Sequence, residues 1–319
     1  MASSNPLRRS SPRRKATSVA VTAAAAAAIV TPQQSAGFVP SPVTSRYFSK
    51  EANTSKASPS SRLFSETDKE VATSSAKKPK VERTHSFQPV WHGSMVKKSG
   101  DSEVADVHTL VLGTHPSIAS LSKSEMFGHT QNAFWWMAGD CLGFRRQLGV
   151  NAEGKPYKLT QYLRYDESDV LSYEDQLQLF TSKGFALWDI IKSCERKGSL
   201  DADIKNEEPN EIWDFCKSHK TVKRIVLANG GTGCTMFNRH FRDWWLSGEL
   251  KPGSNAESKK AFDKFAKKTD NFRDAKIEVI SALSVSPAAA KYSYEEKRQF
   301  WEDYVYGPGL KDHEELQKR

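Results

Sequence analysis

The sequence Val107-His-Thr-Leu-Val-Leu112 is a short apolar run that ends at Gly113 and Pro116. A continuous apolar run of this length, closed by glycine and proline, predicts a buried strand. Short strands that alternate with helices predict an α/β fold with three α/β/α layers around a central, mostly parallel sheet of four to five strands. The functional site then lies at the carboxyl ends of the strands. The other strands are expected at 185–191, 224–228 and 277–283, and the helices at 132–137, 234–246 and 293–304.

The chain divides into an N-terminal segment and one folded domain. Residues 1–87 are expected to be a targeting segment with a disordered linker behind it, because the chain from about residue 50 is polar and poor in apolar residues. Residues 88–310 are expected to form the domain. Within it, the polar and charged stretches 151–175 and 248–275 have the character of insertions.

The N-terminal sequence has the pattern of an organelle-targeting signal. Basic residues within 8–15 precede the alanine-rich stretch 16–30, which is too short for a membrane span and suits the core of a signal peptide. Ser35 and Gly37 stand at positions −3 and −1 before Phe38, and Ser/Thr-rich basic sequence follows. This pattern resembles the bipartite plastid signal of algae with plastids of secondary origin, so we predict plastid localisation. The alternatives are a mitochondrial address, with processing sites at 45–49 and 61–65, and a nuclear one, with a lysine cluster at 77–80.

The net charge of +9 lies entirely in the N-terminal segment. Residues 1–90 hold 14 Lys and Arg against 5 Asp and Glu, whereas residues 91–319 hold 33 of each sign. Any contact of the neutral body with DNA therefore has to come from a local patch. The four cysteines include no closely spaced pair, which argues against a zinc or iron–sulfur site. We expect reduced thiols, no metal, no cofactor, no membrane contact and a monomer.

The loops that follow the predicted strands carry two long motifs. The segments concerned are Gly113-Thr-His-Pro-Ser117, Phe127 with His129-Thr-Gln-Asn-Ala-Phe-Trp135, Trp188-Asp-Ile-Ile-Lys-Ser-Cys-Glu-Arg196 with Gly198-Ser-Leu-Asp201, Asn229-Gly230, and Ser284-Val-Ser-Pro-Ala288. In order and spacing these segments resemble the uracil-DNA glycosylase superfamily, and most closely its hypoxanthine-DNA glycosylase branch, over about 105–305 without the two insertions.

The resemblance implies a monofunctional enzyme that hydrolyses the N-glycosidic bond of a deaminated base in DNA. Such a bond breaks through an oxocarbenium-like state, so a neutral amide suffices to orient the attacking water. Members of this branch carry their catalytic Asn in the His-x-x-Asn-x-Phe-Trp motif, which gives that role to Asn132; the other interpretation of Asn132 is a helix N-cap. His115, where relatives carry Asn or Asp, is the second catalytic candidate, as a protonated group that stabilises the departing anion. Its alternative is a role in loop packing.

An extruded base stacks on an aromatic ring and is read by polar groups in a pocket. The resemblance gives the stacking role to Phe127, for which a place in the core is the alternative. The loop 284–290 is expected to press on the DNA strand, although Leu283 and Ala289 stand where relatives usually have Pro and Asn. The other base-binding candidates are Gly113, Thr114, His129 and Asn229, and those for the DNA strand are Ser117, Ser284, Ser286, Pro287, Ala288 and Lys291.

The remaining motif residues are expected to be structural. Trp188 and Asp189 should build the sheet, Glu195 and Arg196 should form an internal ion pair, and the glycine-rich stretch 230–233 lacks the lysine of a phosphate loop. Hypoxanthine in damaged DNA is the preferred substrate. The alternatives are excision of uracil or of a mismatched base, and a catalytically inactive DNA-binding protein of the same fold.

Overall fold

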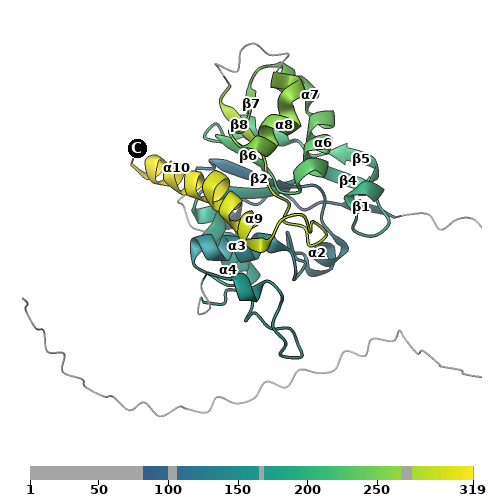
Figure 1. The fold of residues 1–319 in the computed structure, drawn as a ribbon. Helices are drawn as coiled ribbons and strands as arrows, with labels where there is room; N and C mark the ends of the chain where they lie inside the picture. The colour runs from purple at the N-terminus through teal and green to yellow at the C-terminus, as the bar shows by residue number, and fades with distance from the viewer. Residues whose placement is uncertain (1–81, 100–105, 165–168, 267–274, 319) are drawn as a thin grey trace, which may run out of the picture. The chain divides into compact units, whose positions relative to one another are not determined.

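The computed structural model describes residues 82–99, 106–164, 169–266 and 275–318. The central sheet consists of β2 (Thr109–Gly113), β3 (Phe185–Asp189), β6 (Arg224–Leu227), β7 (Leu250–Pro252) and β8 (Ile277–Ser281). Their order is β3-β2-β6-β8-β7, and every neighbouring pair is parallel. Figure 1 labels β2, β6, β8 and β7 of this sheet. The predicted α/β class and the sheet of four to five strands are confirmed.

Two apolar layers cover the two faces of this sheet. Leu110 and Leu112 of β2 pack in one layer and Val111 packs in the other, as the two-residue period of a strand requires. The helices are α1 (His92–Ser99), α2 (Ile118–Lys123), α3 (Ala133–Leu142), α4 (Tyr173–Ser182), α5 (Ile212–Ser218), α6 (Gly230–His240), α7 (Arg242–Leu246), α8 (Ala256–Ala266), α9 (Tyr294–Trp301) and α10 (Gly307–Gln317). Helices α5 to α8 pack in the layer of Leu110, and α3, α4 and α9 pack in the layer of Val111, which gives the predicted three layers (Figure 1).

The strand order reverses at β2. The chain passes from β2 to β3 on one side and then crosses to β6 on the other side of β2. In a parallel sheet the loops on either side of such a reversal leave in opposite directions, so a crevice opens at the carboxyl ends of the two strands. Here those ends are Gly113 and Leu227, which places the segments 113–117 and 229–233 on the crevice.

A second, smaller sheet was not predicted. It joins β1 (Arg83–His85), β4 (Ile191–Glu195) and β5 (Lys205–Pro209) as antiparallel strands in the order β1-β4-β5. The run 185–191, expected as one strand, therefore divides: β3 enters the parallel sheet and β4 enters the antiparallel one. Because β1 belongs to this sheet, the folded body begins before the boundary expected at residue 88.

The stretch 248–275, expected to be an insertion, supplies an edge of the central sheet. β7 pairs in parallel with β8, and its Leu250 is fully buried. α8 packs Phe262 and Phe265 against Trp245, with ring centroids 4.8 Å and 5.1 Å away. The described part of this stretch is therefore integral to the core, and its polar composition reflects the exposed face of an amphipathic helix.

Further expectations differ from the structure in extent. The helix expected at 234–246 divides at Phe241 into α6 and α7, and the helix expected at 293–304 becomes α9, a π-helical turn at Glu302–Tyr306 and α10. α10 carries the body beyond residue 310 to Gln317. The described part of 151–175 holds a 3₁₀ turn at Thr160–Tyr162 and the start of α4.

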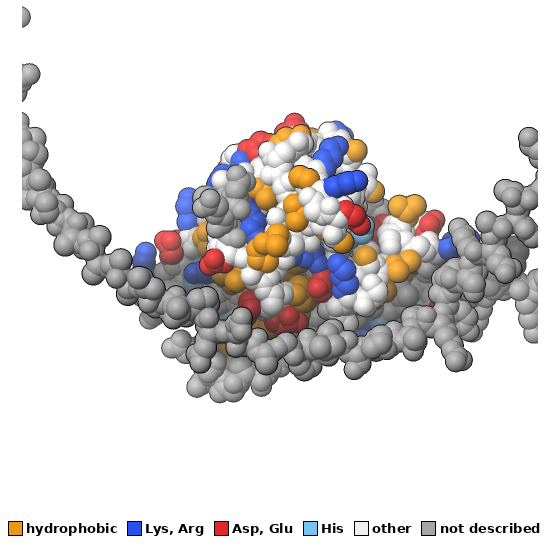
Figure 2. All heavy atoms as spheres, turned by 90° about the horizontal axis from the view of Figure 1, so that it is seen from below, with side chains coloured by type: hydrophobic (Ala, Val, Ile, Leu, Met, Phe, Trp, Pro, Cys, Tyr) orange, Lys and Arg blue, Asp and Glu red, His pale blue; other side chains and the backbone are white. Residues whose placement is uncertain are grey.

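The predicted targeting segment and linker fall almost wholly in residues 1–81, outside the described residues, and stay predictions. No helix in the described ranges is both long and apolar enough to cross a membrane. Within the same ranges no group of three or more His, Cys, Asp or Glu side chains is placed to hold a metal ion, and all four cysteines are free thiols. On the face of the body in Figure 2, acidic and basic side chains are interspersed, in keeping with its neutral charge.

Candidate active site

A cleft of about 600 Å³ opens at the carboxyl ends of β2 and β6. The five segments around it are far apart in the sequence: 113–117, 126–132, 199–202, 229–232 and 284–289. The cleft brings together every site residue predicted from the sequence except Lys291. The Lys291 side chain is exposed and lies 4.7 Å from the ring of Tyr292 instead.

Phe127 is held on the cleft in an unusual backbone conformation. Its φ angle is +55°, which costs energy in a bulky residue and persists only where the surroundings enforce it. Here Gly128 N–H donates to Ser120 Oγ at 2.9 Å, and Arg146 donates to the carbonyl oxygens of Phe127 at 3.2 Å and Gly128 at 3.0 Å. Arg146 is also paired with Glu125. These contacts fix the loop before any ligand arrives.

The ring of Phe127 has one face covered and contributes to the cleft wall. It stacks on Phe134 of α3, with centroids 4.3 Å apart and an interplanar angle of 26°. Phe134 is fully buried, whereas Phe127 is half-buried and lines the cleft. Phe127 is therefore both an extension of the core and a flat apolar surface for a planar ligand.

Asn132 caps α3 and also lines the cleft. Its Oδ1 accepts the N–H of Phe134 at 2.9 Å, so the alternative interpretation of Asn132 as an N-cap describes a real contact. Ala133 N–H donates to the carbonyl oxygen of Val285 at 2.9 Å, which ties the start of α3 to the segment 284–289. An amide oxygen has two lone pairs, so Oδ1 keeps one position for a further donor such as water.

His115 is neutral and engaged on both ring nitrogens. Its Nδ1 lies 3.1 Å from the carbonyl oxygen of Ile191, and its Nε2 lies 2.9 Å from Thr84 Oγ1. A carbonyl oxygen only accepts, so Nδ1 carries the proton and Nε2 accepts from the hydroxyl. Burial lowers the pKa of His115 from 6.5 to about 4. Burial therefore disfavours a protonated His115, and the contacts of both ring nitrogens favour the loop-packing alternative.

Asn229 is oriented by a partly buried network of hydrogen bonds. Its Nδ2 donates to Thr114 Oγ1 at 2.8 Å and to Asp201 Oδ2 at 3.1 Å. A carboxylate only accepts, so the amide nitrogen has to face Asp201, and Oδ1 is left as an acceptor beside the cleft. Burial raises the pKa of Asp201, and its hydrogen bonds with Thr114 and Asn229 oppose that shift.

Arg196 joins two walls of the cleft. It is paired with Asp201 at 3.6 Å and donates to the carbonyl oxygen of Pro116. The expected ion pair between Glu195 and Arg196 is wrong, because Glu195 accepts from Asn206 Nδ2 at 3.1 Å on the other side of β4. Side chains of a strand alternate between its two sides, and neighbours in sequence therefore seldom pair.

Asp189 lies on the cleft at the end of β3. The side chain of Trp188 does build the sheet, as expected, and its Nε1 donates to the carbonyl oxygen of Phe87 at 3.0 Å. Asp189 instead lines the cleft and is only 5% exposed. A Cβ atom on Gly113 would lie closer than 3.0 Å to Asp189 Oδ1, so this approach requires glycine at position 113.

The rim of the cleft consists of polar residues and small residues. Ser117 caps α2 by accepting Ser120 N–H at 3.1 Å. His129 Nδ1 accepts the N–H of Gln131 at 3.2 Å, which assigns the ring proton of a neutral His129 to Nε2. Pro287 and Ala288 are exposed at the mouth, where a strand-pressing loop was expected.

Two curated proteins match the chain. Over 137 residues, 42% of its length, the chain is 28% identical to the hypoxanthine DNA glycosylase of Methanosarcina barkeri, of which the match covers 72%. Over 135 residues it is 29% identical to the hypoxanthine DNA glycosylase of Methanosarcina acetivorans, of which the match covers 71%. No family model matches the chain.

The two relatives bear the name of the branch that the loop motifs resemble, and those motifs meet in one cleft. The chain is therefore similar to the uracil-DNA glycosylase superfamily, near its hypoxanthine branch. A solution NMR structure of a putative uracil DNA glycosylase from Methanosarcina acetivorans aligns over 72% of this chain and 99% of its own, at 18% identity; its TM-score of 0.41 is too low to support an argument about the fold.

Two acidic residues of the cleft were not predicted from the sequence. Asp201 was quoted within its motif without a role, and Asp189 was assigned to the sheet. The position of Asp189 in the sequence could have indicated that it lines the cleft. It ends an apolar strand, and polar residues at the carboxyl ends of parallel strands face the crevice. The role of Asp201 was not predictable, because a glycine-containing turn precedes it and the sequence does not show that the chain returns to the cleft there.

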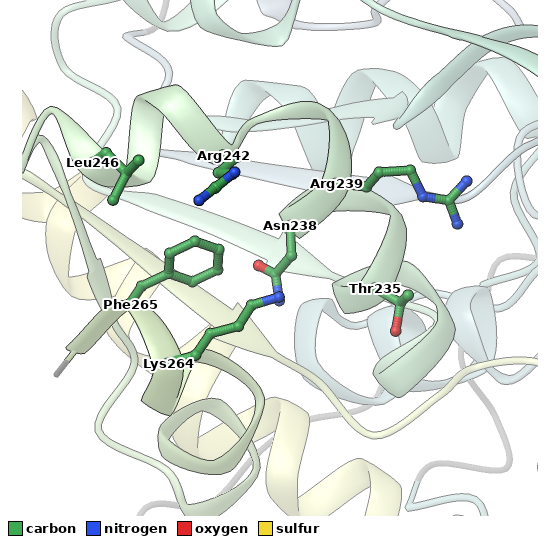
Figure 3. Close-up of a pocket in the computed structure, with 7 residues that line it drawn as sticks. All are labelled: Thr235, Asn238, Arg239, Arg242, Leu246, Lys264 and Phe265. Carbon is green, nitrogen blue, oxygen red and sulfur yellow. The ribbon is translucent and has the colours of Figure 1, made fainter. Parts of the chain in front are cut away.

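A second cavity, of about 530 Å³, lies between α6, α7 and α8 and contains none of the predicted site residues. In Figure 3 the ring of Phe265 and the amide of Asn238 face the same space, and Arg239 extends away from them. Arg239 pairs with Glu207. The residues 267–274, which directly follow α8, lie outside the described ranges. This cavity therefore stays without a functional assignment.

Proposed function

We propose that this DNA glycosylase excises hypoxanthine from DNA in base excision repair. The observation that carries the proposal is the ring of Phe127, which is held on the cleft by its loop and backed by Phe134. A base that leaves the duplex needs such a surface to replace the stacking it loses. The names of the two curated relatives support the choice of base.

The polar groups around Phe127 suit a base edge and a water molecule. Asn229 Oδ1, oriented by Thr114 and Asp201, is an acceptor for a ring N–H of the base. Asn132 Oδ1 is anchored by the N–H of Phe134 and keeps a lone pair for the attacking water. Since the sugar is already strongly electrophilic in the oxocarbenium-like state, orienting the water is sufficient.

The reaction is proposed to be hydrolytic, and Asn132 is its water-positioning residue. The described residues that line the cleft include no lysine, which a Schiff-base mechanism would require. Lys123, at the margin, donates to the carbonyl oxygen of Gly128 at 3.2 Å and so fixes the Phe127 loop. The product is then an abasic site in an unbroken strand.

The proposal is tested with the full-length protein on DNA duplexes that each contain one hypoxanthine, uracil, thymine mismatch or ethenoadenine. We expect excision of hypoxanthine, with strand breakage only after alkali. Phe127→Ala should lower the single-turnover rate by ~10-fold or more, because base stacking on an aromatic ring contributes ~1–3 kcal/mol. Tyr162→Ala, which removes an exposed aromatic ring outside the cleft, is the matched control. Preferred excision of uracil or a mismatched thymine would overturn the choice of base, and no excision of any base would indicate an inactive DNA-binding protein.

A further inference from the structure

Asp189 places a buried carboxyl group on the cleft. It is 5% exposed. Asn210 donates at 2.8 Å to the backbone carbonyl of Asp189, but no side-chain or backbone donor to its carboxyl oxygens is recorded among the described residues. A buried carboxyl group normally has donors that offset the loss of water. A group kept without them in a ligand cleft is free to interact with a ligand.

Its position relative to Phe127 is fixed through Gly113. The position that a Cβ atom of Gly113 would take lies 3.6 Å from Cε1 of Phe127 and 3.5 Å from Cγ of Asp189. The carboxyl group and the aromatic ring therefore flank the same glycine. This arrangement suits a base that stacks on Phe127 and turns one edge toward the carboxyl group.

The charges around Asp189 favour its protonated form. Burial and the neighbouring carboxylate of Asp201 raise the pKa of Asp189 from 3.8 to about 7, and Arg196 opposes this shift. The other titratable groups on the cleft are His115, which is buried and neutral, and half-buried His129. A carboxyl group that holds its proton near neutral pH has the property required of a general acid.

We propose that Asp189 is a catalytic general acid, which passes its proton to a ring nitrogen of the extruded purine. This inference rests on the proposed excision of hypoxanthine. The C1′–N9 bond breaks, its electron pair moves into the base, and the proton of Asp189 makes the departing base neutral. Water, oriented by Asn132, adds to C1′, and the proton that it releases returns to the Asp189 carboxylate.

The test is the pH dependence of the single-turnover rate of hypoxanthine excision, measured from pH 5.5 to 9 on the full-length protein. The wild type should lose rate above about pH 7, approaching tenfold per pH unit, as the acid ionises. The side chain introduced by Asp189→Asn has the same shape as aspartic acid but carries no acidic proton. The rate of this variant should be lower by ~10²-fold and no longer fall as the pH rises.

The matched control is Asp312→Asn. Asp312 accepts hydrogen bonds from Lys223 at 2.6 Å and Arg224 at 2.9 Å and does not line the cleft. This variant loses a carboxylate and should keep the wild-type pH profile. Melting temperatures of all three proteins show which are folded. Should Asp189→Asn not fold, the wild-type profile decides alone.

Three outcomes overturn the inference. In the first, the wild type excises hypoxanthine at a rate that stays constant or rises with pH, and the proposed function then stands without this acid. In the second, Asp189→Asn keeps the wild-type decline above pH 7. In the third, the wild type excises no base, and the proposed function fails as well.

Discussion

Gly113→Ala tests the packing that places Asp189 on the cleft. The new Cβ atom would lie closer than 3.0 Å to Oδ1 of Asp189, so the carboxyl group has to move by about 1 Å to restore a normal contact. Gly113 is not among the glycines with positive φ, so the cost of alanine comes from the clash and not from left-handed backbone strain. Overpacking of a buried site costs about 1–3 kcal/mol in the free energy of unfolding. A displacement of about 1 Å at a catalytic group lowers the rate by ~10²-fold.

The assay is a double-mutant cycle of urea unfolding on the wild type, Gly113→Ala, Asp189→Ala and the double variant. Because Asp189→Ala removes the oxygen that clashes, Gly113→Ala should cost at least ~1 kcal/mol less in that background. Gly231→Ala is the control, since its Cβ atom would have no neighbour within 4 Å. An equal cost of Gly113→Ala in both backgrounds would refute the account of this contact.

Three further predictions concern stability, chemistry and location. Between pH 3.8 and about pH 7, the folded protein holds a proton on Asp189 that the unfolded chain has released. The free energy of unfolding should therefore fall from pH 5 to pH 8, and it should fall less in Asp189→Asn. Equal pH slopes of the two proteins in urea unfolding would contradict this. Borohydride should trap no covalent adduct with hypoxanthine DNA, because the described cleft residues include no lysine; a trapped adduct would demand a Schiff base. Residues 1–87 fused to a fluorescent protein should direct it to the plastid of an alga with a secondary plastid, and fluorescence in mitochondria or nucleus would favour the alternatives.

The central sheet was predictable because its strands are apolar on both faces. Runs such as 107–112 and 224–228 have few other stable arrangements than a covered parallel sheet. The antiparallel sheet was not predictable in this way, because β5 reads Lys-Asn-Glu-Glu-Pro and is largely exposed. Its partner β4 continues directly from an apolar run. Its antiparallel pairing with β1 and β5 shows that the chain has changed sheets.

The cleft was predictable as a set of loops but not as a set of roles. The spacing of the motifs correctly predicted that Asn132 and Phe127 line the same cleft. The state of His115 was not predictable, because it depends on burial and on contacts with Ile191 and Thr84, which lie 76 and 31 residues away in the chain. The environment of Asp189 was equally hidden, since its burial and its contact with Gly113 arise from the pairing of β2 with β3.

The water-positioning role of Asn132 is tested most directly by the single-turnover rate of Asn132→Ala on hypoxanthine DNA. The structure shows that Asn132 caps α3, and loss of a cap destabilises by about 1 kcal/mol without changing the rate per folded molecule. Ser172→Ala removes the N-cap of α4, outside the cleft, and is the matched control. We predict that both variants melt at lower temperature and that only Asn132→Ala loses ~10² or more in rate. A destabilised Asn132→Ala protein with the wild-type rate would contradict the assignment.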